Sequence, residues 1–421
     1  MSTFFKSSLL LGLALALGRI VGFVREMLVA ARLGVSAEAD IAVVFLTLPD
    51  FLVGLLLAGG FTAALVPALK RETGDARDAL FRFVGTWSMA ISILLALLVA
   101  LNPSALFGIL APGLSPQQTQ PWLSSVVYIA LSVPLASFAG LIGAYLNVRG
   151  IFFIVGLGTV AYNLTLCAVL LPNRDPATVL SMLSLGVLAA GLVRLGLLGF
   201  VAKPPVQPRI APPASADGRL ARLFVSGVLA TGIVVLSGIL FRTLAARVGE
   251  GELTAFALAL RLFELPMGLA IAPLTTVLLP SLSTAAPDPG LMRRAFVAGV
   301  GLAGLALVVG QIAGDPIARL IYFRGEMTEA GMADIIRNAR WMFWALPFAA
   351  ASLIAATVLN AARRTDRVLV NSVIALIAGT AVALTGPAMV LPGFVVFHAV
   401  SAGLNLVAIR GRTGPDNAGT A

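Results

Sequence analysis

The first apolar stretch of the chain, residues 5–31, carries the charged side chains Arg19, Arg25 and Glu26 in its interior, well past Lys6 at its start. A charge near the centre of a bilayer costs roughly 2.5–3.5 kcal/mol on insertion scales, so residues of this kind face a water-filled cavity or a bound anion. Guanidinium groups hold phosphate and carboxylate oxygens through paired hydrogen bonds. The stretch therefore predicts a cationic site for an anionic substrate inside a membrane-spanning helix, as in a transporter.

Helical geometry sorts these charges into two stripes. At about 100° per residue, Arg19 and Glu26 lie near one face, and Arg25 and Arg32 share a second face roughly 120° away. The two stripes are expected to line one cavity. The alternative is that Arg25, Glu26 and Arg32 extend to the membrane surface.

Small residues on the same stretch predict a close helix contact. Gly18 and Gly22 are spaced so that both lie on one face, and glycines at this spacing let another helix approach closely. The second stretch begins at Asp40 and carries Asp50 directly after Pro49. Asp40 fits either a helix-start acid or a partner for an arginine.

A second charged pair occurs in the stretch 254–283, where Arg261 and Glu264 are three residues apart and share a helix face. An exchangeable pair would hold the guanidinium until an anionic substrate displaces the carboxylate. A static pair that joins two helices is the alternative. Further cations within or next to apolar stretches are Arg194, Arg242 and Arg247.

The residue inventory argues against an enzyme. The chain has one cysteine, Cys167, and one histidine, His398, whereas a metal or redox site needs several such ligands. No catalytic triad and no glycine-rich phosphate loop with a lysine is present. We expect no catalytic residue, metal or cofactor, and a packing role for Cys167 and His398.

Composition identifies the class of protein. Of 421 residues, 59% are hydrophobic and only 11% are charged, and the mean hydropathy is +0.99. A soluble protein needs enough polar residues on its surface to contact water, and it does not reach such a hydrophobic fraction or mean hydropathy. The net charge of +10 is spread between the apolar stretches, which fits the positive-inside rule and not a nucleic-acid partner.

The expected fold is all-α and polytopic, with about twelve transmembrane helices of roughly 20 residues each. The expected spans are 5–31, 40–69, 80–102, 121–147, 151–172, 177–201, 220–246, 254–283, 292–314, 338–361, 367–387 and 389–409. Basic residues concentrate in every second loop, which places both termini in the cytoplasm.

A proline-rich segment divides the spans equally. Residues 203–219 cannot form a helix and are expected to be a cytoplasmic linker. The expected organisation is an N-terminal lobe over 1–202, a C-terminal lobe over 220–410 and a cytoplasmic tail over 411–421.

Several motifs resemble the MurJ/MviN family of lipid II flippases, part of the multidrug/oligosaccharidyl-lipid/polysaccharide exporter superfamily. They begin with GRIVGFVREMLVAARLGVSAEAD at residue 18 and continue through residue 69. Others are LAPGL (110–114), ALRLFELP (259–266) and TTVLLPSLS (275–283). The resemblance covers about residues 5–410.

The resemblance implies two six-helix lobes around a central cationic cavity in the bacterial inner membrane. The implied activity is alternating-access transfer of an undecaprenyl-diphosphate-linked saccharide, lipid II, to the outer leaflet for peptidoglycan synthesis. Membrane lipids are the other expected partner, and a monomer is expected. The substrate-binding residues carried over are Arg19, Arg25, Asp40, Arg261 and Glu264.

The chain departs from the family pattern after Leu-Pro in the second stretch. The family usually has an asparagine, two arginines and an acid there, whereas this chain has Asp50, Val53, Gly54 and Ala58. It also has twelve expected spans, whereas typical members have two more helices. These differences leave open a flippase for another polyprenyl-linked oligosaccharide. A drug–cation antiporter, a membrane glycosyltransferase and a scaffold protein are more distant alternatives.

Overall fold

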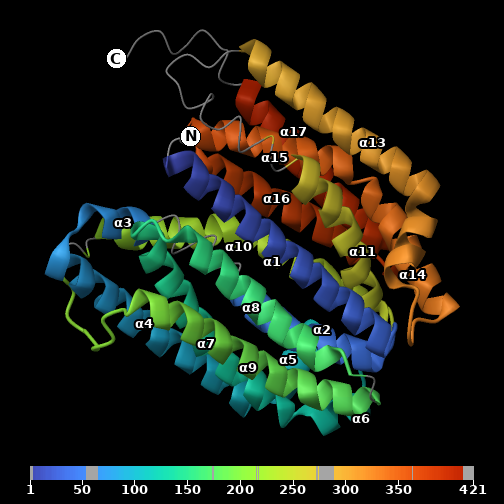
Figure 1. Ribbon diagram of the computed structural model, residues 1–421. Helices are drawn as coiled ribbons and strands as arrows, with labels where there is room; N and C mark the ends of the chain where they lie inside the picture. The colour runs from blue at the N-terminus through green and yellow to red at the C-terminus, as the bar shows by residue number, and fades with distance from the viewer. Residues whose placement is uncertain are drawn as a thin grey trace. The chain divides into compact units, whose positions relative to one another are not determined.

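The computed structural model describes residues 3–53, 65–172, 175–214, 216, 218–271, 274, 289–362 and 364–410. Over these residues the chain consists of helices and connecting turns, without a β-strand (Figure 1). Seven described helices are long and apolar enough to cross a membrane. An eighth span results if α14 (Glu329–Phe343) and α15 (Leu346–Ala361), which are bent by 48° at their junction, count as one. The all-α multi-pass membrane fold is thus confirmed, and the count of about twelve spans stays a prediction.

The chain divides into two compact units, Met1–Val235 with Arg324–Met327, and Leu236–Phe323 with Thr328–Ala421. The division falls within the helix α10 (Gly218–Ala246). The expected lobes 1–202 and 220–410 stay predictions, and the expected tail lies outside the described residues. Residues 203–214 contain no helix, as their prolines predict, whereas α10 begins at Gly218, inside the segment 203–219 that was expected to contain no helix.

The first unit is built around five long helices, α1, α4, α7, α8 and α9. Helix α1 packs along α8, α8 along α9, and α7 contacts both α4 and α9 (Figure 1). The helices of this unit are α1 (Thr3–Leu33), α2 (Ala37–Val53), α3 (Val66–Arg71), α4 (Gly74–Leu101), α5 (Pro103–Leu110), α6 (Pro116–Thr119), the 3₁₀ turn η2 (Gln120–Trp122), α7 (Ser125–Val148), α8 (Phe152–Leu170), α9 (Pro176–Ala202) and most of α10.

Local signals set the limits of α9. The carboxylate of Asp175 accepts a hydrogen bond from the backbone N–H of Thr178 at 3.0 Å, which satisfies a free donor at the helix start. Pro176 occupies the first helical position, where its missing N–H is not needed. Lys203 ends the helix in a left-handed conformation, φ 44°.

The second unit contains the C-terminal end of α10 and the remaining helices. Helix α17 packs between α15 and α16, and α13 contacts α14 and α15. Phe241, Phe256 and Phe263 all have ring contacts with Phe394 of α17. The helices of this unit, besides α14 and α15, are α11 (Glu252–Pro266), the π-helical turn η3 (Met267–Ile271), α13 (Pro289–Tyr322), α16 (Thr365–Ala383), the 3₁₀ turn η4 (Pro387–Met389) and α17 (Val390–Arg410).

Candidate functional site

Helix α1 is held against α8 at the two predicted glycines. A Cβ atom added at Gly18 would lie 3.4 Å from Cγ2 of Thr159, and one at Gly22 would lie 3.6 Å from Nδ2 of Asn163. The thiol of Cys167 on α8 lies 3.8 Å from a backbone oxygen of α1. The predicted close contact is confirmed, and it fixes the orientation of the charged face of α1.

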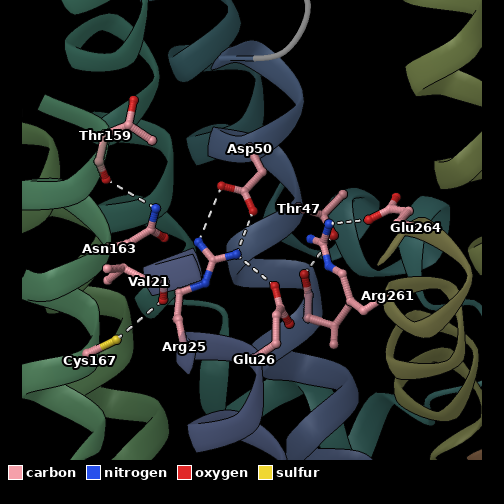
Figure 2. Close-up of polar contacts among 11 residues, drawn as sticks. Val21, Arg25, Glu26, Thr47, Asp50, Thr159, Asn163, Cys167, Arg261 and Glu264 are labelled. Carbon is pink, nitrogen blue, oxygen red and sulfur yellow. Dashed lines mark hydrogen bonds and ion pairs between the residues drawn. The ribbon is translucent and has the colours of Figure 1, made fainter. Parts of the chain in front are cut away.

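Arg25 is the centre of a buried ion-pair group on α1. Its Nη2 lies 2.7 Å from Oε1 of Glu26 and 2.8 Å from Oδ2 of Asp50, and Nη1 lies 3.4 Å from Oδ1 of Asp50. Figure 2 shows the guanidinium between the two carboxylates. The side chain of Arg25 is 4% exposed and that of Asp50 is 37% exposed. One guanidinium faces two carboxylates, so the group has a net negative charge when all three are ionised.

The other predicted charges of α1 have different surroundings. Arg19 is exposed. Arg32 is partly buried, and its Nε donates to the carbonyl of Leu170 at 2.9 Å, while its Nη2 donates to the carbonyl of Leu171. These carbonyls end α8, where a cation satisfies free acceptors and complements the helix dipole. Arg32 therefore caps the end of α8, and a functional stripe shared by Arg25 and Arg32 stays a prediction.

Asp40 lies in the first turn of α2 and is 1% exposed. An acid at this position complements the positive end of the helix dipole, and a role of Asp40 as a partner for an arginine stays a prediction. The same helix carries Asp50, which was expected only as a residue after Pro49 and now proves to be a partner of Arg25.

Two polar residues of α8 and one of α9 are also buried in the first unit. Tyr162, Asn163 and Arg194 are 6%, 7% and 2% exposed, respectively. The sequence predicts Arg194 as a cation of an apolar stretch, whereas it does not predict Tyr162 and Asn163. Their signal is two adjacent polar residues in the mainly apolar stretch 151–172.

In the second unit, Arg261 and Glu264 form the predicted i,i+3 pair on α11. Nη1 of Arg261 lies 2.8 Å from Oε2 of Glu264 (Figure 2). Their side chains are 29% and 46% exposed, in contrast to Arg25. An ion pair this accessible has a low cost of separation, because water can replace each partner.

Two further polar features of the second unit are structural. His398 has ring contacts with Phe263, Phe394 and Phe397, which confirms its predicted packing role. Asn405 accepts a hydrogen bond from Asn371 at 2.9 Å and donates one to Ser352 at 3.2 Å. This network joins α15, α16 and α17.

Within the described part of the chain, no cluster of three or more His, Cys, Asp or Glu side chains could hold a metal ion. The ion pairs of the site are formed by guanidinium and carboxylate groups. A buried guanidinium can bind a phosphate oxygen if a carboxylate gives up its place. Gly54, Ala58 and the motif at 275–283 lie outside the described residues.

Comparison with known proteins identifies the family of this chain. The family model described as "Lipid II flippase MurJ" matches residues 29–412. A relative from Rhizobium meliloti, "Probable lipid II flippase MurJ", is 28% identical over 336 residues, which covers 74% of this chain and 62% of the relative. Another from Vibrio cholerae with the same name is 26% identical and covers 77% of this chain and 66% of the relative. The chain thus spans less than two thirds of the length of these relatives.

Solved structures show the same fold. A "Lipid II flippase MurJ, inward closed conformation" superposes with a TM-score of 0.85 at 17% identity, covering 96% of this chain and 87% of that one. An inward-facing multidrug resistance MATE family transporter superposes with a TM-score of 0.73 at 14% identity, covering 93% and 94%. At these identities the likeness concerns the fold alone.

Proposed function

We infer that this chain, which belongs to the lipid II flippase MurJ family, moves a polyprenyl-diphosphate-linked saccharide across a bacterial cytoplasmic membrane. The proposed substrate is lipid II, the peptidoglycan precursor, and the proposed direction is from the inner to the outer leaflet. The protein acts as a monomeric alternating-access transporter with both termini in the cytoplasm, and it catalyses no covalent step.

The observation that carries this proposal is the buried guanidinium of Arg25 in a helix with the composition of a membrane span. The burial of a cation at 3% exposure in such a helix has a high desolvation cost. Charged residues that are kept in membrane helices despite this cost mark substrate or ion pathways. The two counter-ions of Arg25 are single carboxylates that a multivalent diphosphate can replace. Paired hydrogen bonds from a guanidinium suit phosphate oxygens.

The geometry of the Arg25 group indicates the order of events. With both carboxylates in place the group repels a diphosphate, so one of them must leave before the anion binds. Asp50 is the more exposed of the two and belongs to another helix, whereas Glu26 is adjacent to Arg25 on α1. We assign Asp50 as the carboxylate that gives way to the substrate.

The remaining predicted residues are assigned to the same activity. Arg261 binds substrate after its exposed pair with Glu264 separates, and the exposed Arg19 makes a further contact with an anionic group. Asp40 is assigned as an acid that orients α2. Arg19 and Asp40 belong to the first unit, whereas Arg261 and Glu264 belong to the second, and each role is assigned within its own unit.

Family membership favours a saccharide-lipid carrier over a drug–cation antiporter or a glycosyltransferase. A different polyprenyl-linked oligosaccharide remains the second candidate substrate, because Asp50 partly neutralises Arg25 at the position where the family usually has an asparagine.

Complementation tests the substrate. The chain is expressed in a strain depleted of its own lipid II flippase, beside the variants Arg25→Lys and Arg261→Ala and the control Arg71→Met, which changes an exposed cation at the end of α3. We expect rescue by the wild-type chain and the control, and not by the other two. Lack of rescue by a well-expressed wild-type chain would exclude lipid II. Proteoliposomes that contain other polyprenyl-diphosphate saccharides would then identify the second candidate.

A further inference from the structure

Helices α8 and α9 hold buried hydrogen-bond donors that nothing in the described part of the chain satisfies. They are Nε and Nη2 of Arg194 and the hydroxyl of Tyr162. The two side chains lie within electrostatic range of one another. All three donors therefore belong to one buried region of the first unit.

Packing fixes the stem of Arg194 in this region. A Cβ atom added at Gly158 of α8 would lie 3.5 Å from Cγ of Arg194 and 3.1 Å from Cδ2 of Leu198. The absence of a side chain at Gly158 lets the arginine stem lie against the backbone of α8. Arg194 also lies about 12 Å along the helix axis from Ala202, the last residue of α9, at a rise of 1.5 Å per residue. Because Arg194 is far from this helix end and its stem is packed against α8, its guanidinium is held among the helices of the first unit.

The charge of Arg194 has no hydrogen-bonded counter-ion among the described residues. The carboxylate of Asp50 is within electrostatic range, but both of its oxygens are hydrogen-bonded to Arg25. Glu26 is likewise paired with Arg25. A buried cation in this state is strongly destabilising unless an anion compensates for it.

We propose that Arg194 and Tyr162 bind a small monovalent anion of the halide type between α8 and α9. The free groups are N–H and O–H donors beside a positive charge, which is the complement of a halide. A water molecule would satisfy one donor, whereas an anion would also give the guanidinium of Arg194 the hydrogen-bonded counter-ion that it lacks among the described residues. The 2% exposure of Arg194 and 6% exposure of Tyr162 leave the site closed to a diphosphate.

One nearby polar atom belongs to a different contact. Oδ1 of Asn163 also lacks a partner among the described residues, and as an acceptor it would repel an anion. It faces Gly22 of α1, where an added Cβ atom would lie 3.7 Å away. It is therefore part of the α1–α8 contact and not of the proposed anion site.

Chloride-dependent stability tests the site on the full-length chain in detergent. The unfolding midpoint is measured in sodium chloride and in sodium gluconate at equal ionic strength, which removes general screening effects. A ligand that binds only the folded state raises the midpoint as its concentration increases. We expect this rise for the wild-type chain and for the Arg71→Met control. Tyr162→Phe should weaken the apparent chloride affinity about tenfold by removing one hydrogen bond to a charge, and Arg194→Met should abolish the dependence.

Crystals grown in sodium bromide test the location of the anion directly. We expect an anomalous bromide peak at hydrogen-bond distance from the guanidinium of Arg194 and the hydroxyl of Tyr162. This measurement uses the unchanged chain, so it decides the question even if Arg194→Met does not fold. Equal chloride dependence in all variants, or a water molecule or carboxylate in place of bromide, would overturn the proposal. Neither result depends on which saccharide the protein carries.

Discussion

Asp50 of α2 holds Arg25 of α1 through two hydrogen bonds, the shorter of which is 2.8 Å. The two residues are 25 positions apart in sequence, so this ion pair joins separate helices. Since Asp50 is the exposed member of the Arg25 group, it controls how much positive charge the group offers to a ligand.

Asp50→Asn should strengthen the binding of a polyprenyl diphosphate. The change removes one negative charge from beside Arg25, and a unit charge at this range contributes on the order of 1–3 kcal/mol in a protein environment. We expect an affinity gain of about tenfold, measured by titration of the purified protein with a labelled polyprenyl diphosphate. Asp315→Asn makes the same change in the exposed pair with Arg319 and should leave affinity unchanged. Equal or weaker binding by Asp50→Asn would argue against the assigned order of events.

A double-mutant cycle should separate the structural role of Arg25 from its role in transport. Arg25→Met removes the cation between the carboxylates of Glu26 and Asp50, and breaking a buried ion pair in this way costs about 3–5 kcal/mol. Adding Glu26→Gln removes the charge of Glu26 and should recover most of the lost stability, as measured by denaturant unfolding in detergent micelles. The double variant should still fail to transport because no guanidinium remains for the diphosphate. Transport by a folded double variant would contradict the role of Arg25.

The sequence locates the charges better than it locates their partners. Arg25, and the pair Arg261 and Glu264, could be predicted because ionisable residues stand out in apolar stretches and the i,i+3 spacing follows from helix geometry. The pairing of Arg25 with Asp50 could not, because it depends on how α1 and α2 pack. Tyr162 carries no charge and resembles a core residue until its buried hydroxyl is located in three dimensions.

The Asn405 network should contribute measurably to the stability of the second unit. Asn405→Ala leaves the amide of Asn371 without its acceptor and removes a donor to Ser352. Leaving buried polar groups unsatisfied costs about 1–3 kcal/mol, although hydrogen bonds between membrane helices average nearer 0.6 kcal/mol. We expect a loss of about 1–2 kcal/mol in unfolding experiments. Thr357→Ala, which removes only a hydrogen bond to the carbonyl of Leu353 in its own helix, should cost less. A larger loss for the control would exclude the network as the source.

The start of α9 should weaken in acid. Asp175 accepts hydrogen bonds from the side chain and the backbone N–H of Thr178, and these bonds lower the pKa of the carboxyl below its ordinary value. The cap is therefore fully formed above the unfolded-state pKa and is lost as the pH falls through the lower, folded-state pKa. Amide exchange at Val179, corrected for the intrinsic rate, should accelerate in that acidic window. Asp175→Asn should make the protection there independent of pH, and pH-independent protection in the wild-type chain would contradict the cap.

Gly325 should be among the least replaceable glycines of the first unit. It belongs to the segment Arg324–Met327, which is part of that unit, and an added Cβ atom would lie 2.0 Å from the carbonyl oxygen of Ala31. The backbone N–H of Glu326 donates to the same oxygen at 2.9 Å, so the backbone cannot withdraw without losing this bond. Gly325 also has a left-handed φ of 63°.

Gly325→Ala therefore combines conformational strain with a backbone clash, and Gly74→Ala supplies the matched control. Gly74 has a φ of 52° but nothing within 4 Å of an added Cβ atom, so its replacement costs only the left-handed strain of about 1–2 kcal/mol. We expect Gly325→Ala to lower the free energy of unfolding by clearly more than this control, measured in the same detergent. Equal losses for the two variants would show that the segment does not pack against the end of α1.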